Sequence, residues 1–203
     1  MKRNICRFVV SALTAVLIWG CYPNGPDYTE DLDVVYTTYD KEFDFKSRST
    51  YSMPDKIVVD VKVDNGDTTY IFMNAVFATP ILASIEANMT ALGWTRVTNI
   101  NNADVVLSPA GVSSTTYFYS YWYDWYYGGY WGWYYPPYYS VSSYTTGSLI
   151  MVIADPSINN PINRSPTSWI GAMNGVLTNT YDINRVTKGI DQAFAQSPYL
   201  KTN

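Results

Sequence analysis

The chain has 203 residues, of which 13 are basic and 17 acidic, and it contains no histidine. The missing histidine excludes Ser-His-Asp and Cys-His catalysis, histidine metal ligands and histidine-based pH switches. The net charge of −4 comes without a basic stripe, which disfavours nucleic acid and anionic lipid surfaces as partners.

Residues 1–20 are typical of a secretory leader. Three basic residues are followed by an apolar stretch of about 13 residues, shorter than the roughly 20 residues of a membrane-spanning helix. Gly20 then precedes Cys21, the layout of a bacterial lipoprotein signal. We predict cleavage before Cys21 and its acylation with chains such as palmitate, two or more of which anchor a protein stably. An ordinary cleaved signal, with Cys21 incidental, is the alternative.

Residues 21–31 contain two prolines, a glycine and mostly polar side chains, which predicts a tether. The mature chain would carry 10 basic and 17 acidic residues, a net charge of −7. Cys6 leaves with the leader and Cys21 is acylated, so no disulfide is expected. Residues 32–203 suit one domain, and its core is expected to suffice without covalent cross-links.

The first part of this domain carries β signals. Asp33 to Thr38 is rich in β-branched and aromatic residues, which predicts a strand, and the signal continues from Thr50 to Val63. Apolar residues at every second position of the latter segment imply one buried face. The turn Asp64 to Asp67 contains Asn-Gly, which accepts the positive φ angles of a tight hairpin.

The clearest helix begins at Thr79-Pro80, a threonine cap followed by a proline at the first helical position. Apolar residues then recur at helical spacing up to Leu92, and Gly93 ends the helix. An earlier start, near Met73, would place Pro80 inside the helix and kink it.

In the second part of the domain, the sequence predicts four strands and a helix. The strands are Trp94–Val97, Asp104–Leu107, Leu149–Ala154 and Ser168–Leu177, and the amphipathic helix is Ile183–Gln196 with Asp182 as its cap. The Leu149 run predicts a central strand buried on both faces, and residues 157–167 predict a loop. This order favours an α+β two-layer sandwich, with a mostly antiparallel sheet of about five or six strands and two helices on one face.

Residues 117–139, the aromatic tract, form a Tyr/Trp-rich insert broken by Gly-Gly and Pro-Pro pairs, which predicts a long aromatic-rich loop. Tyrosine and tryptophan offer flat apolar faces with polar handles, suited to sugar rings, peptides or lipid headgroups. The candidate ligand-binding residues are Trp122, Trp125, Tyr126, Trp131 and Trp133. Two alternatives remain: the rings pack on one another and on the sheet, or they lie at a membrane interface.

Two acidic patterns are weaker. Asp60 with the 64–67 turn partly matches a calcium loop, but Lys62 stands at a ligand position and no closing glutamate follows, so a plain hairpin is predicted. Asp40 with Glu42 or Asp44 would suit glycoside hydrolysis if the carboxyl groups faced each other about 5 to 9 Å apart. Solvated surface charge is the simpler interpretation, so we predict no catalytic residue, metal ligand or cofactor.

Several short motifs run through the mature chain in order. They are Asp44-Phe45 with Thr50-Tyr51, Leu92-Gly93-Trp94-Thr95 with Ala103-Asp104-Val105, Thr146-Gly147-Ser148-Leu149 leading to Asp155, Trp169-Ile170-Gly171, Ala193-Phe194 and Ser197-Pro198-Tyr199. In these motifs the chain resembles the Gram-negative envelope lipoproteins that carry the domain of unknown function 4136. The resemblance implies a secreted, lipid-anchored α+β domain without assigned activity and supplies no catalytic residues. We expect Phe45, Tyr51 and Trp169 to be core aromatics.

The sequence therefore predicts a non-enzymatic protein of the cell envelope, anchored to the outer membrane through Cys21. Its aromatic loop would contact glycan, peptide or another envelope protein. A purely structural lipoprotein with a self-packed loop is the first alternative, and a hydrolase that uses two carboxylates is the second.

Overall fold

The computed structural model describes residues 34–64, 67–112, 147–157, 167–177 and 182–203. The chain divides into two compact units, Met1–Leu32 and Asp33–Asn203, and the described residues all belong to the second. Its strands are β1 (Val35–Tyr39), β2 (Thr50–Ser52), β3 (Val58–Asp64), β4 (Asp67–Phe72), β5 (Thr95–Arg96), β6 (Val105–Val112), β7 (Ser148–Ala154) and β8 (Thr167–Met173), and its α-helices are α2 (Ala75–Ala91) and α4 (Ile183–Ala195). No helix among these residues is long and apolar enough to cross a bilayer.

The eight strands form one sheet in the order β1-β8-β7-β6-β2-β5, while β3 joins β6 at Val58 and β4 pairs with β3. The long ladders β1–β8, β8–β7, β7–β6 and β3–β4 are antiparallel, and the short β2 runs parallel to β5 and β6. All seven residues of β7 are buried. This confirms the predicted central strand.

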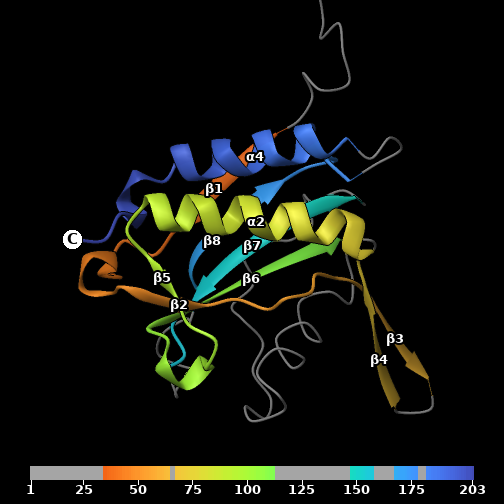
Figure 1. The fold of residues 1–203 in the computed structure, drawn as a ribbon, viewed down its shortest axis with the longest axis horizontal. Coiled ribbons are helices and arrows are strands. Elements are labelled where there is room, and N and C mark those ends of the chain that lie inside the picture. The colour runs from red at the N-terminus through yellow and green to blue at the C-terminus, as the bar shows by residue number, and fades with distance from the viewer. Residues whose placement is uncertain (1–33, 65–66, 113–146, 158–166, 178–181) are drawn as a thin grey trace, which may run out of the picture. The chain divides into compact units, whose positions relative to one another are not determined.

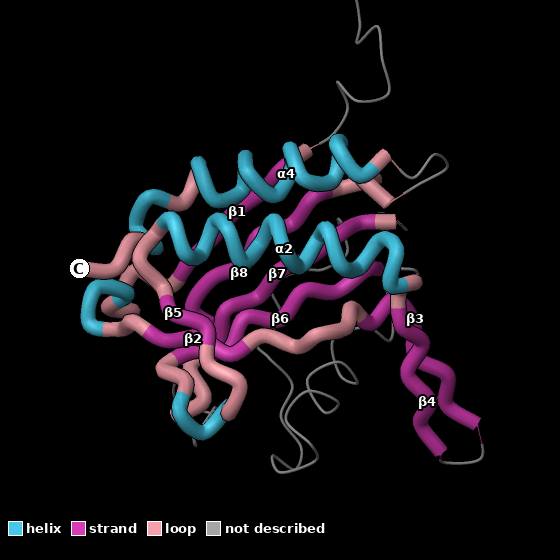
Figure 2. Tube along the Cα trace, in the orientation of Figure 1, coloured by secondary structure: helices cyan, strands magenta, loops and turns pink. Residues whose placement is uncertain are grey.

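Helices α2 and α4 lie side by side on one face of the sheet (Figures 1 and 2). They and the sheet enclose a core that includes the expected aromatics Phe45, Tyr51 and Trp169. The α+β arrangement with two helices on one face of a mostly antiparallel sheet is thus confirmed. The aromatic-rich loop of the prediction lies outside the described residues.

The strand count of five or six was too low for two reasons: β4, the second strand of the hairpin, was not predicted, and the segment from Thr50 to Val63 is not one strand. It breaks between β2 and β3 around Met53-Pro54, where proline supplies no backbone N–H for a ladder. Proline also occurs inside β6, which extends past the predicted end at Leu107. β2 pairs with β6 only up to Val106 and β3 meets it at Ala110, so Pro109 has no partner in either strand, and a proline is tolerated at such an interrupted edge.

The predicted cap at Thr79 was wrong, and the earlier start is confirmed. Asn74 caps α2, since its side-chain oxygen accepts the Val76 N–H at 3.0 Å, and Pro80 lies inside the helix. Proline there leaves the Val76 carbonyl without its helical partner, but Val76 is 74% exposed, which lets water serve instead. Gly93 ends the helix at φ 95, and a Cβ there would lie 2.3 Å from the Thr202 hydroxyl oxygen.

The last strand is also shorter than predicted. β8 ends at Met173 rather than Leu177, because residues 174–177 form a turn in which Gly175 takes a positive φ of 73. Asp182 caps α4 as expected, accepting the Asn184 N–H at 2.9 Å.

The C-terminal segment is tied to the core by two tryptophans. The Trp94 indole N–H donates to the Leu200 carbonyl at 2.7 Å, and the Trp169 indole N–H donates to the Ser197 hydroxyl at 2.9 Å. The Thr202 N–H donates to the Leu92 carbonyl at 3.0 Å. The chain end therefore closes over the junction of α2 and β5.

One buried polar atom differs from these hydrogen-bonded indole and amide groups. The Tyr51 hydroxyl is fully buried and finds no hydrogen-bond partner among the described residues. Burial raises the pKa of Tyr51 to about 12; the Glu86 carboxylate adds to the rise and the Arg96 guanidinium opposes it.

We predict that Tyr51→Phe leaves the free energy of unfolding unchanged or raises it by up to about 1 kcal/mol, because it removes an unsatisfied buried hydroxyl. The folded-state pKa of Tyr51 exceeds the unfolded value of about 10, so the unfolded chain loses this proton first. Titration of Tyr51 therefore leaves the free energy of unfolding unchanged below pH 10 and lowers it as pH rises from 10 through 12. Urea unfolding at pH 7 and between pH 10 and 12 measures both effects, and the alkaline loss should be smaller in the variant.

Trp94→Phe is the positive control for the loss of a hydrogen bond made by a buried aromatic residue. It breaks the hydrogen bond to Leu200 and leaves a void, and should lower the free energy of unfolding by about 2 to 4 kcal/mol. A loss of more than about 1 kcal/mol in Tyr51→Phe at pH 7 would show that the hydroxyl has a partner.

Candidate functional site

The aromatic tract leaves and re-enters the domain at one place. Val112 at the end of β6 pairs directly with Ser148 at the start of β7. The tract and its candidate residues Trp122, Trp125, Tyr126, Trp131 and Trp133 lie outside the described residues, as does Cys21. What the structure defines is the base from which the tract departs: two neighbouring strands in the middle of the sheet.

The re-entry point of this base is held in place by the turn after β8. Gly147 has a φ of 84, a backbone conformation that favours glycine, and its carbonyl accepts the Leu177 N–H at 2.7 Å. The Ser148 hydroxyl donates to the Asn174 side-chain oxygen at 3.0 Å. The Gly-Ser-Leu motif thus fixes where the tract rejoins the sheet.

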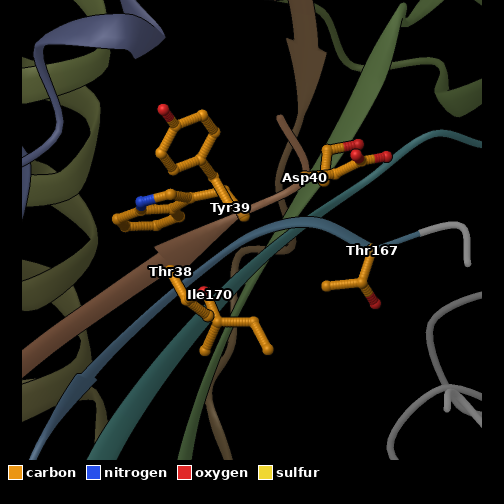
Figure 3. A pocket seen from close by; sticks show the side chains of 7 residues that line it. Thr38, Tyr39, Asp40, Thr167 and Ile170 are labelled. Atoms are coloured by element: carbon orange, nitrogen blue, oxygen red, sulfur yellow. The ribbon is translucent and has the colours of Figure 1, made fainter. Parts of the chain in front are cut away.

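An open hollow of about 200 Å³ lies at the opposite end of the sheet, where β1 ends and β8 begins (Figure 3). Its described lining residues are Thr38, Tyr39, Asp40, Thr167, Ser168, Trp169 and Ile170. The Tyr39 ring and the Asp40 carboxylate point away from each other at the end of β1 (Figure 3). The hollow is therefore lined by hydroxyl groups, one carboxylate and parts of two aromatic residues.

Tyr39 belongs to a row of rings at this end of the molecule. It is 37% exposed and stacks on Tyr199 with the ring centroids 3.6 Å apart, and Phe45 and Phe43 continue the row. The Arg48 guanidinium lies 5.7 Å from the centroid of Phe43. The sequence did not reveal this row, because its members come from both ends of the domain.

Arg48 also pairs with Asp155, which follows β7 and is almost fully buried. Their closest side-chain atoms are 3.3 Å apart, and the Ser157 N–H and hydroxyl donate to the other Asp155 oxygen at 2.8 and 2.6 Å. These contacts satisfy the buried carboxylate and join the start of β2 to the end of β7.

Asp104 forms a second clamp, between β6 and β2. One of its oxygens accepts the Ser49 and Thr50 amide N–H groups and the Thr50 hydroxyl, each at 2.9 Å. Burial alone would raise the pKa of Asp104, but these hydrogen bonds, together with the positive charge of Arg48, lower it overall.

The carboxylates of the hydrolase hypothesis have local roles. Asp40 accepts the Glu42 N–H at 2.9 Å, and Asp44 accepts the Lys46 N–H at 3.1 Å as the cap of a short 3-10 helix. Asp40 is the one carboxylate among the described residues that line the hollow. A glycosidase would need a second facing carboxyl group, which these residues do not supply there.

Strands β3 and β4 pair antiparallel as the two arms of a hairpin. Asp64 and Asp67 pair across β3 and β4, with Asn65 and Gly66 outside the described residues. Among residues that the structure describes, no group of three or more histidine, cysteine or carboxylate side chains is placed to hold a metal ion.

The chain matches a family model described as a domain of unknown function, DUF4136, over residues 35–199. It is 34% identical to a DUF4136 family protein from Bacteroides thetaiotaomicron whose crystal structure superposes with a TM-score of 0.61, covering 83% of this chain and 97% of that one. No curated protein sequence matches.

Two structures of the PelC dodecamer from Paraburkholderia phytofirmans superpose with TM-scores of 0.40 and 0.39 at 13% and 10% identity. Each match covers 84% of this chain, and 98% and 99% of the PelC chains. These similarities are too low to carry an argument about this chain.

We predict that Asp104→Asn lowers the free energy of unfolding at pH 7 by about 1 to 2 kcal/mol, because the three hydrogen bonds lose their charged acceptor. The folded-state pKa of Asp104 is lowered, so its contribution is complete above an unfolded value of about 3.9 and is lost as pH falls below it. Urea unfolding of both proteins from pH 7 to pH 3 should show their difference shrinking with acid.

The same substitution at Asp182 serves as the control. Asparagine caps helices as well as aspartate does, so Asp182→Asn should change the free energy of unfolding by only a few tenths of a kcal/mol. An Asp104→Asn effect that stayed constant down to pH 3 would contradict the assignment to the charged form.

Proposed function

The chain belongs to the DUF4136 family, and we propose that it is a non-enzymatic lipoprotein of the outer membrane, whose folded domain is a scaffold for the aromatic tract. The tract makes the functional contact, with glycan, peptide or another envelope protein. Acylated Cys21 holds the domain at the membrane through the tether of residues 21–31.

The observation that carries this proposal is the register of β6 and β7. Because Val112 pairs with Ser148, the tract is an insertion between adjacent antiparallel strands, a connection that two residues can make. Its length and aromatic content therefore serve something other than joining the strands.

A non-enzymatic role is supported by how the described carboxylates are used. Asp104 and Asp155 accept hydrogen bonds that hold strand ends together, and Asp40 and Asp44 accept backbone N–H groups of their own turns. Each of these four carboxylates acts in the fold, and Asp40 is the one among the described residues that lines the hollow.

The anchor is tested by substituting each cysteine of the chain in turn. We expect the wild type to incorporate labelled palmitate and to sediment with membranes, and Cys21→Ala to do neither. Cys6→Ala, in the leader, is the control and should behave as the wild type. Mass spectrometry that found Cys21 unmodified in the native protein would overturn the anchor.

The contact is tested with the full chain, a deletion of residues 117–139, and a variant with Trp122, Trp125, Trp131 and Trp133 all changed to alanine. In a glycan array and a cell-wall pulldown, we expect wild-type binding to fall at least tenfold in both variants. Trp94→Phe, a change in the buried core, should bind as the wild type. Equal binding by all four proteins would remove the tract from the function.

Acrylamide quenching of tryptophan fluorescence gives an independent readout of accessibility. Trp94 and Trp169 are 2% and 0% exposed, so they form a shielded reference in the mature chain. An accessible tract predicts a quenchable fraction that the fourfold alanine variant lacks.

A further inference from the structure

Strand β1 forms one edge of the sheet, and its outer side has no partner strand among the described residues. Its even-numbered residues bond to β8: the Val34 carbonyl accepts an N–H that follows β8 at 3.0 Å, and the Asp40 N–H donates to a β8 carbonyl at 2.9 Å. In an antiparallel ladder, residues that bond to a given neighbour alternate with residues that do not. The N–H and C=O groups of Val35, Thr37 and Tyr39 therefore point outward from the edge.

The sequence of β1 lacks the features that keep sheet edges from pairing. Edge strands in natural proteins are commonly very short, bulged, or marked by prolines and charged side chains. β1 has five residues, VYTTY, without a charge or a proline, and its ladder to β8 runs without a register shift. At the opposite edge, β5 is two residues long, and its Arg96 pairs with Glu86 at 2.7 Å. Of these two edges, β1 is the one open to another strand.

Large apolar side chains beside this edge are exposed. Val34 is 58% exposed and Tyr36 is 51% exposed. Val35 packs against the core under the helices, so its even-numbered neighbours point to the other face of the sheet. An edge strand with outward backbone groups and exposed apolar side chains is suited to strand addition.

We propose that β1 is a dimer interface, at which β1 of a second copy of the chain adds antiparallel across a two-fold axis beside Thr37. This axis pairs Thr37 with its own copy and Val35 with Tyr39 of the second copy. The outward N–H and C=O groups of all three residues are then bonded. Tyr36 lies opposite Thr38 of the second copy and diagonal to the second Tyr36, within reach of an aromatic ring.

The pattern of β1 suits a copy of itself better than an unrelated strand. Across a two-fold axis each residue meets its mirror position, so charges of one sign near the centre would oppose one another. The strand is uncharged and extends two residues to each side of Thr37. Threonine opposite threonine is a favourable cross-strand pair. The centre and both arms of the strand therefore match under the same symmetry.

Helix α4 supplies a second layer to this interface. A strand of five residues is about 17 Å long, a small contact beside the roughly 1,200–2,000 Å² that a stable interface buries. α4 contacts both β1 and β8 on the helix face of the sheet (Figure 1). Because strands are about 4.8 Å apart, the axis places α4 of the second copy about 10 Å away on the same face, a distance at which helices pack.

Sedimentation equilibrium tests the dimer in residues 21–203 with Cys21→Ser, a chain that contains the whole second compact unit. We expect this parent chain to sediment as a dimer. Thr37→Pro should raise the dimer dissociation constant about tenfold or more, because proline removes the central outward N–H and leaves the ladder to β8 intact. Tyr36→Lys should weaken the dimer as well, since it places two like charges diagonally across the axis.

Val76→Lys is the matched control. Val76 is 74% exposed at the start of α2, so the same change from an exposed apolar residue to lysine should leave the dissociation constant unchanged. A parent chain that stays monomeric over the whole concentration range would overturn the proposal. So would a dimer that neither β1 variant weakens.

Disulfide trapping measures the register without a proline in the strand. The parent chain has no other cysteine, so Thr37→Cys places each introduced thiol beside its own copy, at the Cα separation of about 5.5 Å that a disulfide can span. We expect mild oxidation to link Thr37→Cys chains into dimers and to leave Val76→Cys chains unlinked. A mixture of Tyr36→Cys and Thr38→Cys chains should link faster than either variant alone.

Equal cross-linking of Thr37→Cys and Val76→Cys would refute the two-fold pairing, because random collision would then account for both. The dimer rests neither on acylation of Cys21, which is absent from the parent chain, nor on what the aromatic tract binds. A failure of the dimer and a failure of the proposed function are therefore distinguishable.

Discussion

The structure depends on the burial of β7 on both of its faces. Its seven residues are all buried, and it pairs along its length with β6 and β8. Leu149, Met151 and Ile153 point into the core under the helices, while Ile150 and Val152, which alternate with them, are not part of that core. A strand of this kind is stable only if apolar material covers both sides of the sheet. Helices α2 and α4 cover one side of β7, where Leu149, Met151 and Ile153 join the core.

The second structural theme is that the chain end belongs to the core. The indoles of Trp94 and Trp169 are buried, and each would lose its hydrogen-bond partner if the segment from Ser197 to Leu200 detached. Tyr199 in the same segment stacks on Tyr39 beside the hollow. The hollow and the row of rings therefore depend on the same tail that completes the packing of the helices, which accounts for the Ser-Pro-Tyr motif without a ligand.

Much of this fold could be predicted from local patterns in the sequence. The apolar run at Leu149, the spacing in α4 and the Asn-Gly turn each have a short-range physical cause, and all were predicted. The start of α2 was ambiguous because both asparagine and threonine can cap a helix, and in the structure the Asn74 side chain accepts the Val76 N–H. The clamps of Asp104 and Asp155 could not be predicted, because their partners Thr50 and Arg48 lie 54 and 107 residues away. The candidate residues of the tract and Cys21 lie outside the described residues and remain predictions.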